Sequence, residues 1–205
     1  MIDFYTWTTP NGRKVSILLE ELGLDYTVRS INIGAGDQKT PEFLKISANN
    51  KIPAIVDHDT GMSLMESGAI LIYLAEKHNQ FLPKNNIGRA TVIEWLMWQM
   101  GSAPFLGGGF GHFYVYAPFK QEYPIERYTM EAKRQLDVLN KHLAENKYMA
   151  GDEYSIADMA IWPWYGKLVL GDLYGAAEFL DVGEYQYVQR WAKMIAERPA
   201  VKRGI

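Results

Sequence analysis

The sequence predicts an α/β domain at residues 1–83 followed by an all-helical domain at residues 84–205. The first observation that predicts this fold class comes from roughly the first eighty residues. There, short apolar runs typical of strands alternate with helical periodicity in the order β-α-β-α-β-β-α. The second is that strand patterns are absent after residue 88, where apolar residues recur at helical spacing. The third is a segment rich in Asn and Pro at residues 78–88, which is typical of a linker.

The first half of the α/β domain is predicted to contain two strands and two helices. We expect the strands near residues 2–5 and 26–33, where apolar residues alternate. The helix between them should begin after the turn at residues 8–12 and close at Gly23, because apolar residues recur at i, i+3, i+4 and i+7. Thr40 as N-cap and Pro41 at the first helical position indicate a second, short helix.

Residues 50–77 are predicted to form a β-hairpin and a helix. Pro53 stands at the entry to an apolar strand, a position open to proline because proline cannot donate to the sheet ladder. The expected order is a strand at residues 54–56, a turn at 59–61 and a return strand at 63–65. Ser67 is the predicted N-cap of the helix that follows at once.

The Glu66–Ser67 junction has groups that could bind a charged ligand. The N-terminus of a helix attracts anions such as a carboxylate, and Glu66 could receive an ammonium group. Together these groups would match the two charges of a free α-amino acid. The alternative is a capped surface helix with a solvated Glu66, and the junction taken alone favours this alternative.

The second domain shows only helical patterns. We expect a buried central helix around residues 93–100, a long amphipathic helix from Pro124 to near Asn146 and a last helix around residues 188–195. The glycines at residues 107–111 interrupt the first of these and are interpreted as a loop that needs room. Ser155 and Asp158 are spaced as the N-cap and N3 residues of a capping box, to which we assign a structural role only.

Composition limits the partners of the protein. The formal net charge is −3 and no basic run occurs, so nucleic acid and anionic membranes are not expected to bind. Hydrophobic residues make up 48% of the chain, but no apolar stretch approaches the length of a membrane span, and the N-terminus lacks a signal-peptide pattern. We therefore predict a cytoplasmic protein.

Cysteine and metal chemistry are limited in the same way. The chain has no cysteine, so it has no disulfide and no thiolate nucleophile of its own. Its four histidines have no ligand spacing among themselves, and we predict no metal site. No Gly-x-Ser-x-Gly motif of an acyl hydrolase is present.

Three motifs in combination resemble those of the glutathione transferases: Asn50-Lys51-Ile52-Pro53, Glu66-Ser67-Gly68-Ala69-Ile70 and the capping box at Ser155. The resemblance covers essentially the whole chain and implies a thioredoxin-like first domain. Motifs at residues 9–12, 103–113 and 124–128 are most similar to the Nu-class, disulfide-bond oxidoreductase branch of this family, in particular to its YghU-type bacterial members. Each motif is weak alone, and the combination is specific.

The resemblance implies that the protein binds glutathione as a cosubstrate, with one or two molecules per subunit. The expected glutathione-binding residues are Gln38, Lys51, Ile52, Pro53, Glu66, Ser67 and Arg127. In the family the peptide bond before the proline is cis, and the backbone of Ile52 pairs with the cysteinyl part. Glu66 and Ser67 would bind the γ-glutamyl part, which agrees with the charge argument above. Gln38 and Lys51 would approach the glycine carboxylate. The alternative interpretation is that these two residues belong to a solvated loop and bind no ligand.

The resemblance places the glutathione thiol beside the turn at residues 9–11, with Thr9 and Asn11 as catalytic residues. A hydroxyl and an amide N–H can both donate to a thiolate and thereby lower its pKa. The alternative is a plain turn with Asn11 as helix N-cap, and both interpretations can hold together. Arg127 would add a positive charge near the sulfur, whereas without the resemblance it is a surface helix residue. Tyr5 lies mid-strand and is interpreted as a packed aromatic residue.

The predicted function is therefore a glutathione-dependent disulfide-bond oxidoreductase of glutathione transferase type, in which a bound glutathione thiolate attacks small disulfides. Because the chain lacks cysteine, every sulfur in the reaction must come from glutathione or the substrate. Two alternatives stay open. One is conjugation of glutathione to apolar electrophiles, with aromatic residues 112–116 as a pocket wall. The other is a non-catalytic glutathione-binding scaffold. The resemblance also implies a homodimer.

Overall fold

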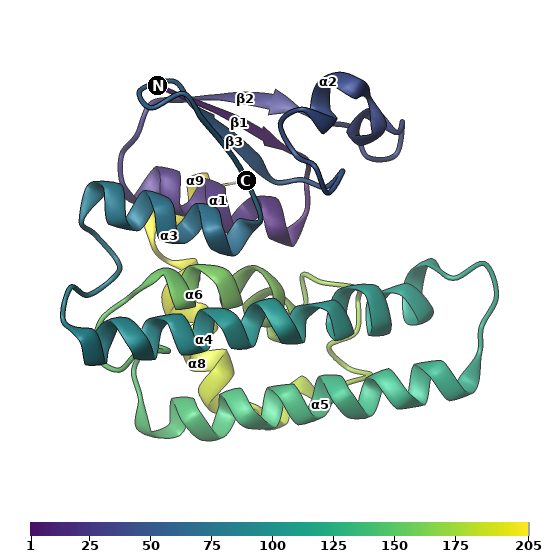
Figure 1. Ribbon diagram of the computed structural model, residues 1–205. Helices are drawn as coiled ribbons and strands as arrows, with labels where there is room; N and C mark the ends of the chain where they lie inside the picture. Colours follow the sequence, from purple (N-terminus) through teal and green to yellow (C-terminus); the bar gives the residue numbers. More distant parts are fainter. Residues whose placement is uncertain (205) are drawn as a thin grey trace. The chain divides into compact units, whose positions relative to one another are not determined.

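The structure, a computed structural model, describes residues 1–204, which separate into two compact units. The first unit is Met1–Pro83 together with the C-terminal segment that begins at Arg198, and the second is Lys84–Glu197. The first unit contains a sheet with helices and the second is helical (Figure 1). The fold class predicted from the sequence is thus confirmed.

The C-terminal segment corrects the predicted domain division. The sequence assigns residues 84–205 to one helical domain, but α9 (Pro199–Arg203) packs against α1 (Pro10–Glu21) of the first unit (Figure 1). The side chains of Ala200 and Val201 are buried there. Burial of these apolar groups explains why the end of the chain returns to the first unit.

The first unit is built around a four-stranded mixed sheet in the order β2-β1-β3-β4. Its strands are β1 (Ile2–Thr6), β2 (Tyr26–Ser30), β3 (Ala54–Asp57) and β4 (Met62–Met65). β1 is parallel to β2 and antiparallel to β3, and β3 is antiparallel to β4. Phe4 of β1 lies opposite Val28 and Ile55, and the buried Phe4 and Ile55 anchor the centre of the core.

Strand β2 ends at Ser30, earlier than the sequence predicts. The reason is local: the Asn32 side-chain oxygen accepts hydrogen bonds from the backbone N–H groups of Gly34, at 3.0 Å, and Ala35, at 3.1 Å. A carboxylate oxygen of Asp37 in turn accepts from the Asn32 backbone N–H at 2.9 Å. These side chains bind the backbone groups that a longer strand would use, so the chain turns instead.

Helices α1 and α3 (Ser67–His78) pack against each other and cover one face of the sheet (Figure 1). A 3₁₀ turn at Asp37–Lys39 leads into the short helix α2 (Pro41–Leu44). Thr40 is the N-cap of α2, as predicted, and its hydroxyl accepts a hydrogen bond from the Phe43 backbone N–H at 3.3 Å. The predicted order of elements in this unit is confirmed.

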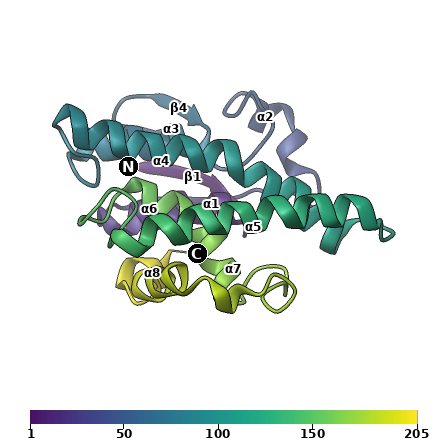
Figure 2. The same cartoon turned by 90° about the horizontal axis from the view of Figure 1, so that it is seen from below.

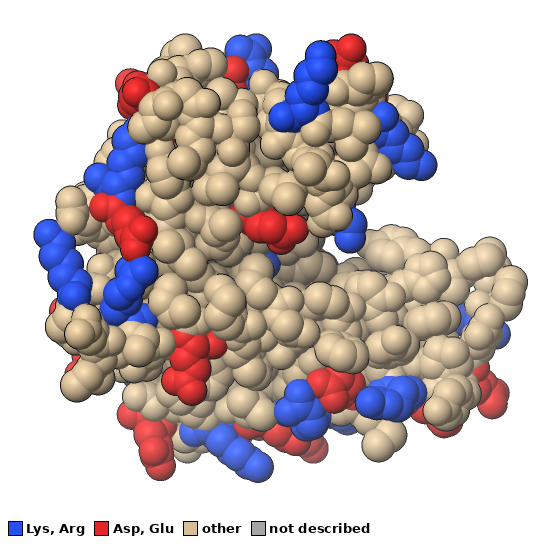
Figure 3. Space-filling view, in the orientation of Figure 1, with Lys and Arg blue, Asp and Glu red and all other residues tan. Residues whose placement is uncertain are grey.

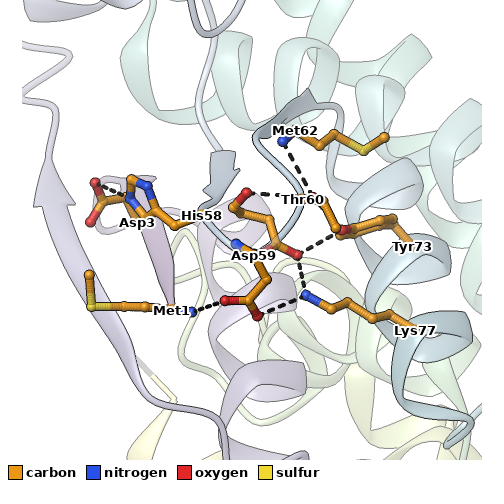
Figure 4. Close-up of polar contacts among 9 residues, drawn as sticks. Met1, Asp3, His58, Asp59, Thr60, Met62, Tyr73 and Lys77 are labelled. Atoms are coloured by element: carbon orange, nitrogen blue, oxygen red, sulfur yellow. Dashed lines mark hydrogen bonds and ion pairs between the residues drawn. The ribbon is translucent and has the colours of Figure 1, made fainter.

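A network of hydrogen bonds and ion pairs connects the β3–β4 hairpin to α3 (Figure 4). One carboxylate oxygen of the buried Asp57 accepts from the Tyr73 hydroxyl at 2.7 Å and from Lys77 Nζ at 2.6 Å. Lys77 Nζ also lies 3.2 Å from Asp59. Burial alone would raise the pKa of Asp57, but the hydrogen bonds from Lys77 and Tyr73 outweigh it and lower the pKa to about 2. The hairpin and α3 are therefore held together by a charged carboxylate.

The second unit consists of helices of very different lengths. They are α4 (Asn86–Pro104), a π-helical continuation at Phe105–Tyr116, α5 (Glu122–Glu145), α6 (Ile156–Ile161), a π-helical stretch at Trp162–Gly166, α7 (Lys167–Val169), a 3₁₀ turn at Val182–Glu184 and α8 (Gln186–Ala196). Helix α5 runs antiparallel to α4 (Figures 1 and 2). Helix α6 packs against α4, and α8 packs against α5.

The buried central helix of this unit is α6 and not α4, which corrects the sequence prediction. All six residues of α6 are buried. In α4, Met97 is exposed, while Trp95 and Trp98 are half-buried with their ring centroids 5.6 Å apart. The tryptophans widen the apolar face of α4 without burying its whole circumference. The capping box that starts α6 is confirmed, with both reciprocal bonds between Ser155 and Asp158 present.

The glycines at residues 107–111 lie in the π-helical continuation of α4 rather than in a loop, which is a second correction. They allow aromatic rings to pack directly on the helix backbone. A Cβ atom at Gly107 would lie 2.5 Å from the Trp164 ring, and one at Gly109 would lie 2.3 Å from the Tyr128 ring. The space that the glycines provide is thus used for packing.

The surface carries both signs of charge. Figure 3 shows Lys and Arg interspersed with Asp and Glu on the face drawn. Among residues 1–204, no helix is long and apolar enough to cross a membrane. The same residues contain no group of three or more His, Cys, Asp or Glu that could hold a metal ion.

Candidate active site

The start of α1 is fixed by Thr9 and Pro10. Thr9 is the N-cap, with an extended backbone (φ −138°, ψ 156°), and its Oγ1 accepts a hydrogen bond from the Gly12 backbone N–H at 3.2 Å. Pro10 takes the first helical position, where no N–H is needed. The interpretation of Asn11 as N-cap is wrong, because Thr9 has that role and Asn11 is the second helical residue.

Gly12 brings the start of α1 close to the end of β1. A Cβ atom at this position would lie 2.3 Å from Thr6 Oγ1 and 2.8 Å from the carbonyl oxygen of Trp7. Only glycine fits at such distances without a backbone shift. This close approach sets Thr9 and Asn11 beside the C-terminal end of the strand.

Thr9 and Asn11 offer hydrogen-bond donors at a positively polarised helix end. Both residues are half-buried. The Thr9 oxygen serves as the cap, which leaves the hydroxyl hydrogen able to donate to another acceptor, and the Asn11 amide carries two N–H donors. The α1 dipole adds positive potential at the same place. A thiolate bound here would be favoured over its thiol, so its pKa would be lowered.

Tyr5 on β1 has a packing role. Its ring centroid lies 6.1 Å from that of Phe43 on α2. Side chains alternate along a strand, so Tyr5 faces α2 while its neighbour Phe4 faces the α1–α3 core. This contact agrees with the interpretation of Tyr5 as a packed aromatic residue.

The loop before β3 presents backbone groups. The Ile52–Pro53 peptide bond is cis, Pro53 is buried and Ile52 is half-buried. The Ser47 hydroxyl donates to the carbonyl oxygen of Lys51 at 2.8 Å and so orients the loop. Neither backbone polar group of Ile52 pairs with another backbone group within residues 1–204. An extended peptide ligand could pair with these groups in the manner of an added strand.

Gln38 lies in the 3₁₀ turn at Asp37–Lys39, and Lys51 lies in the loop before β3. The side-chain amide nitrogen of Gln38 donates to the carbonyl oxygen of Ile33 at 3.4 Å, whereas its Oε1 is buried and has no hydrogen-bond partner within the described residues. Oδ1 of Asn50, the residue before the exposed Lys51, is likewise buried and has no hydrogen-bond partner within the described residues. Buried polar atoms without partners are uncommon in native proteins, so these two oxygens are places where a donor of a ligand could bind. No hydrogen bond or ion pair joins Gln38 to Lys51 within residues 1–204.

The start of α3 combines an unusual backbone with a buried hydroxyl. Glu66 has φ 70° and ψ 114°, a region that residues other than glycine rarely adopt and that is common at binding sites. Glu66, and not the predicted Ser67, is the N-cap, because its carbonyl already accepts the first helical bond, from Ile70 at 3.0 Å. The Glu66 carboxylate is exposed and accepts from Asn49 Nδ2 at 3.3 Å. Ser67 is buried.

Lys14 is a site residue that the sequence interpretation missed. It is 2% exposed, and its Nζ lies 3.4 Å from Ser67 Oγ. Burial lowers the pKa of Lys14 to about 7, while the charge of Glu66 acts in the opposite direction. A signal was present: Ile17 and Leu18, three and four residues later, are apolar and buried, which places Lys14 on the inner face of α1.

Arg127 is an exposed residue of α5 in the second unit. It is therefore not among the predicted residues that the first unit brings together. Within the second unit, the hydrogen bond from Arg134 is the main cause that lowers the pKa of Glu131, and the charge of Arg127 adds to this effect.

The fold and the site define a class of protein in which a thioredoxin-like ligand-binding domain precedes an all-helical domain. The family model for the N-terminal domain of glutathione S-transferase matches residues 2–76, and the model for the C-terminal domain matches residues 122–193. The chain belongs to the glutathione S-transferase family.

Similar proteins are known in several bacteria. The chain is 57% identical over 211 residues to the disulfide-bond oxidoreductase YghU of Escherichia coli K12, which covers 99% of this chain and 73% of the relative. The crystal structure of glutathione transferase YghU from Streptococcus pneumoniae, complexed with glutathione, superposes with a TM-score of 0.97 at 55% identity and covers 99% of this chain and 81% of that one. The crystal structure of a glutathione transferase from Pseudomonas putida, with one glutathione disulfide bound per subunit, superposes with a TM-score of 0.93 at 44% identity. The match covers 99% of this chain and 90% of that chain.

Proposed function

We propose that the protein is a glutathione-dependent disulfide-bond oxidoreductase. The observation that carries this proposal is a thioredoxin-like unit with the polar side chains of Thr9 and Asn11 at the start of α1, in a chain that has no cysteine. Any thiol–disulfide chemistry at this site must take its sulfur atoms from bound glutathione and from the substrate. The activity named for the E. coli relative and the glutathione disulfide bound to the P. putida protein support the same reaction class.

The reaction consists of two thiol–disulfide exchanges. The thiolate of a bound glutathione attacks one sulfur of a small disulfide, forms a mixed disulfide and releases the other sulfur as a thiolate, which takes up a proton. A second glutathione thiolate then attacks the glutathionyl sulfur of the mixed disulfide and releases the remaining substrate thiol. Two glutathiones are oxidised to glutathione disulfide, and one substrate disulfide is reduced to two thiols.

In this proposal Thr9 and Asn11 are the catalytic residues. The Thr9 hydroxyl and the Asn11 amide donate to the sulfur, and the α1 dipole favours the charged thiolate. The family resemblance, and not the geometry of the first unit, is the support for proposing that Arg127 adds a positive charge near the sulfur. Lowering the thiol pKa toward the ambient pH increases the fraction of thiolate, which is the attacking species.

The other residues hold the glutathione molecule. The proposed binding residues are Gln38, Lys51, Ile52, Pro53, Glu66 and Ser67. The backbone of Ile52 pairs with the cysteinyl part. The N-terminus of α3 with Ser67 binds the γ-glutamyl carboxylate, and the exposed Glu66 carboxylate binds its ammonium group. Gln38 and Lys51 take the glycine end.

Conjugation to apolar electrophiles is the alternative reaction. Its sequence support, the aromatic residues at 112–116, is weakened by their packing on other rings. The centroids of Phe113 and Tyr128 lie 5.7 Å apart in a stacked arrangement, and those of Tyr114 and Phe179 lie 4.7 Å apart. We therefore prefer disulfide reduction. Nu-class membership, a homodimer and a cytoplasmic location stay predictions that rest on the resemblance and on composition.

Two substrates distinguish the reactions. With glutathione as reductant, we expect the protein to turn over 2-hydroxyethyl disulfide far faster than it conjugates 1-chloro-2,4-dinitrobenzene. Disulfide reduction is followed through the glutathione disulfide formed, and conjugation through the absorbance of the product. Faster conjugation would refute the redox assignment. Glutathione binding by calorimetry without either activity would favour the scaffold.

A further inference from the structure

Asn11 and Gly12, at the start of α1, form the one Asn-Gly pair of the sequence. Asparagine is a labile residue, and it is most labile before glycine. The backbone nitrogen of the following residue can attack the side-chain amide carbon, and a glycine has no side chain to hinder the approach. Every other asparagine of the sequence is followed by a larger residue. The most reactive asparagine of the chain is therefore also a residue of the proposed thiol site.

The reaction of such a pair has two steps and consumes only water. The Gly12 nitrogen loses its proton and bonds to the side-chain carbonyl carbon of Asn11. The bond from that carbon to the amide nitrogen breaks, so ammonia leaves and a cyclic imide remains. Water then opens the ring and gives either aspartate or isoaspartate, in which the backbone runs through the side-chain carboxyl carbon.

The structure holds the Gly12 nitrogen away from this reaction. Its N–H donates to Thr9 Oγ1 at 3.2 Å, so the proton that must leave is engaged. Asn11 is the second residue of α1, and ring closure requires it to leave the helical backbone. Gly12 is also buried, and a Cβ atom there would lie 2.3 Å from Thr6 Oγ1 and 2.8 Å from the Trp7 carbonyl oxygen. The glycine therefore has little room to move while the first turn is closed.

Thr9 fastens the first turn of α1 through two of its groups. Its side-chain oxygen accepts from the Gly12 N–H, and its backbone carbonyl accepts from the Arg13 N–H at 3.1 Å. Helix ends open more readily than helix centres, and loss of an N-cap makes this opening easier. The dipole of α1 acts in the opposite direction, because its positive end favours the anionic nitrogen through which the attack proceeds. The cap thus decides how often Gly12 can reach the side chain of Asn11.

We propose that Asn11 is a deamidation site that the Thr9 cap keeps closed. When the first turn of α1 opens, the Gly12 nitrogen attacks Asn11 and the side-chain amide is lost. A carboxylate in its place has no N–H donor and carries a negative charge, so it disfavours a thiolate nearby. This consequence for activity rests on the proposed function, whereas the modification itself does not.

The test is peptide mass spectrometry of the folded chain after incubation at mildly alkaline pH. Conversion is read from the mass of the peptide that contains Asn11, and the aspartate and isoaspartate products are separated by chromatography. We expect conversion to be at least about tenfold slower in folded wild type than in the chain unfolded in guanidinium chloride. Folded Thr9→Val should be converted roughly fivefold faster than folded wild type, which is the increase in the open population that loss of an N-cap gives.

Two variants control for the cap. Thr9→Ser keeps the capping oxygen and should be converted at the wild-type rate. Thr40→Val removes the cap of α2, which also precedes a proline, and should leave the conversion of Asn11 unchanged. Equal rates in folded and unfolded wild type, or in Thr9→Val and wild type, would overturn the proposal. If Thr9→Val does not fold, Thr9→Ala replaces it, with the same outcomes.

Activity is measured on the same samples. Disulfide reduction should fall in proportion to the fraction of Asn11 converted, and Asn11→Asp, which matches one of the two products, should lack most of the wild-type activity. Conversion without loss of activity would uphold the modification site and refute the catalytic role proposed for Asn11. The two assignments therefore fail separately.

Discussion

Thr9 combines a structural role and a proposed chemical role in one side chain. Its oxygen caps α1 by accepting from Gly12, and its hydroxyl hydrogen is proposed to donate to the glutathione thiolate. Thr9→Val keeps the shape and removes both functions. We expect kcat/KM for disulfide reduction to fall roughly 100-fold, the loss seen when one donor to a developing anion is removed. The pKa of the bound thiol, followed by thiolate absorbance, should rise because the thiolate loses a donor.

Thr40 provides a matched control for the capping effect. Like Thr9 it is an N-cap followed by proline, and its hydroxyl accepts from Phe43 at 3.3 Å. Thr40→Val should cost about 1 kcal/mol of stability, as loss of a cap does, without changing the thiol pKa. Asn11→Ala should also reduce activity more than Tyr5→Phe. Equal effects of these two substitutions, or a thiol pKa unchanged in Thr9→Val, would contradict the thiol-site assignment.

Among the elements, the β3–β4 hairpin and α3 depend on the charge of Asp57. Its pKa is lowered from 3.8 to about 2 in the folded protein. The folded state therefore holds the carboxylate charged, and this contribution to stability is present above about pH 4 and is lost as the pH falls toward 2. The difference in pKa corresponds to about 2 kcal/mol. We expect Asp57→Asn to lower the free energy of unfolding by about this amount at pH 6.5, measured by urea denaturation.

The pH dependence separates this effect from a packing defect. The difference between wild type and Asp57→Asn should shrink between pH 4 and pH 2, because protonation of the Asp57 carboxylate, which begins in the unfolded chain, removes its contribution to stability. Asp59→Asn is the control, since Asp59 contacts Lys77 at 3.2 Å but is exposed, and it should have little effect. A difference that stays constant across this pH range would show that the charge of Asp57 is not its cause.

The π-helical continuation of α4 offers a second test at this scale, through two adjacent glycines. A Cβ atom at Gly109 would lie 2.3 Å from the Tyr128 ring, whereas one at Gly108 would meet nothing within 4 Å. Gly109→Ala should therefore destabilise the second unit by roughly 1–3 kcal/mol through overpacking. Gly108→Ala should be neutral or stabilising by up to about 1 kcal/mol, because alanine favours a helix. Urea denaturation of both variants measures the contrast, and equal effects would refute the packing role of Gly109.

For the molecule as a whole, the features that could be predicted from the sequence are local. The order of strands and helices in the first unit follows from periodicity, and the caps at Thr40 and Ser155 follow from residues close in sequence. The prediction of a loop at the glycines of residues 107–111 is wrong because the rings that pack on them, such as Trp164, are distant in the chain. The return of α9 to the first unit was missed for the same reason, since its contact with α1 spans almost the whole sequence.

The candidate site shows the same limit. The pairing of opposite charges at Glu66 and the helix start could be inferred from two neighbouring residues. Lys14 could not be placed there, because its contact with Ser67 joins residues 53 positions apart and forms only when α1 packs on α3. A single lysine in an amphipathic helix is ordinarily a surface residue. The proposed catalytic roles of Thr9 and Asn11 rest on the family resemblance, since a Thr-Pro-Asn turn by itself indicates only a helix start.

The return of the C-terminal segment makes the first unit depend on residues that follow the helical unit. Arg198 donates to both carboxylate oxygens of Glu21, at 2.6 and 2.9 Å, and Ala200 and Val201 are buried against this unit. Deletion of residues 198–205 should uncover apolar surface of α1 and remove this ion pair. We expect a loss of roughly 3 kcal/mol or more from the stability of the first unit.

Hydrogen exchange measures this effect separately in each unit. Amides of α1 should lose protection in the truncated protein, while those of α8 in the second unit should keep theirs. Glutathione affinity should fall as well, because α1 carries both Thr9 and Lys14. Arg203→Ala, which removes only an exposed ion pair with Glu20, is the control and should change protection little. Unchanged protection of α1 after truncation would show that the first unit is stable without its C-terminal helix.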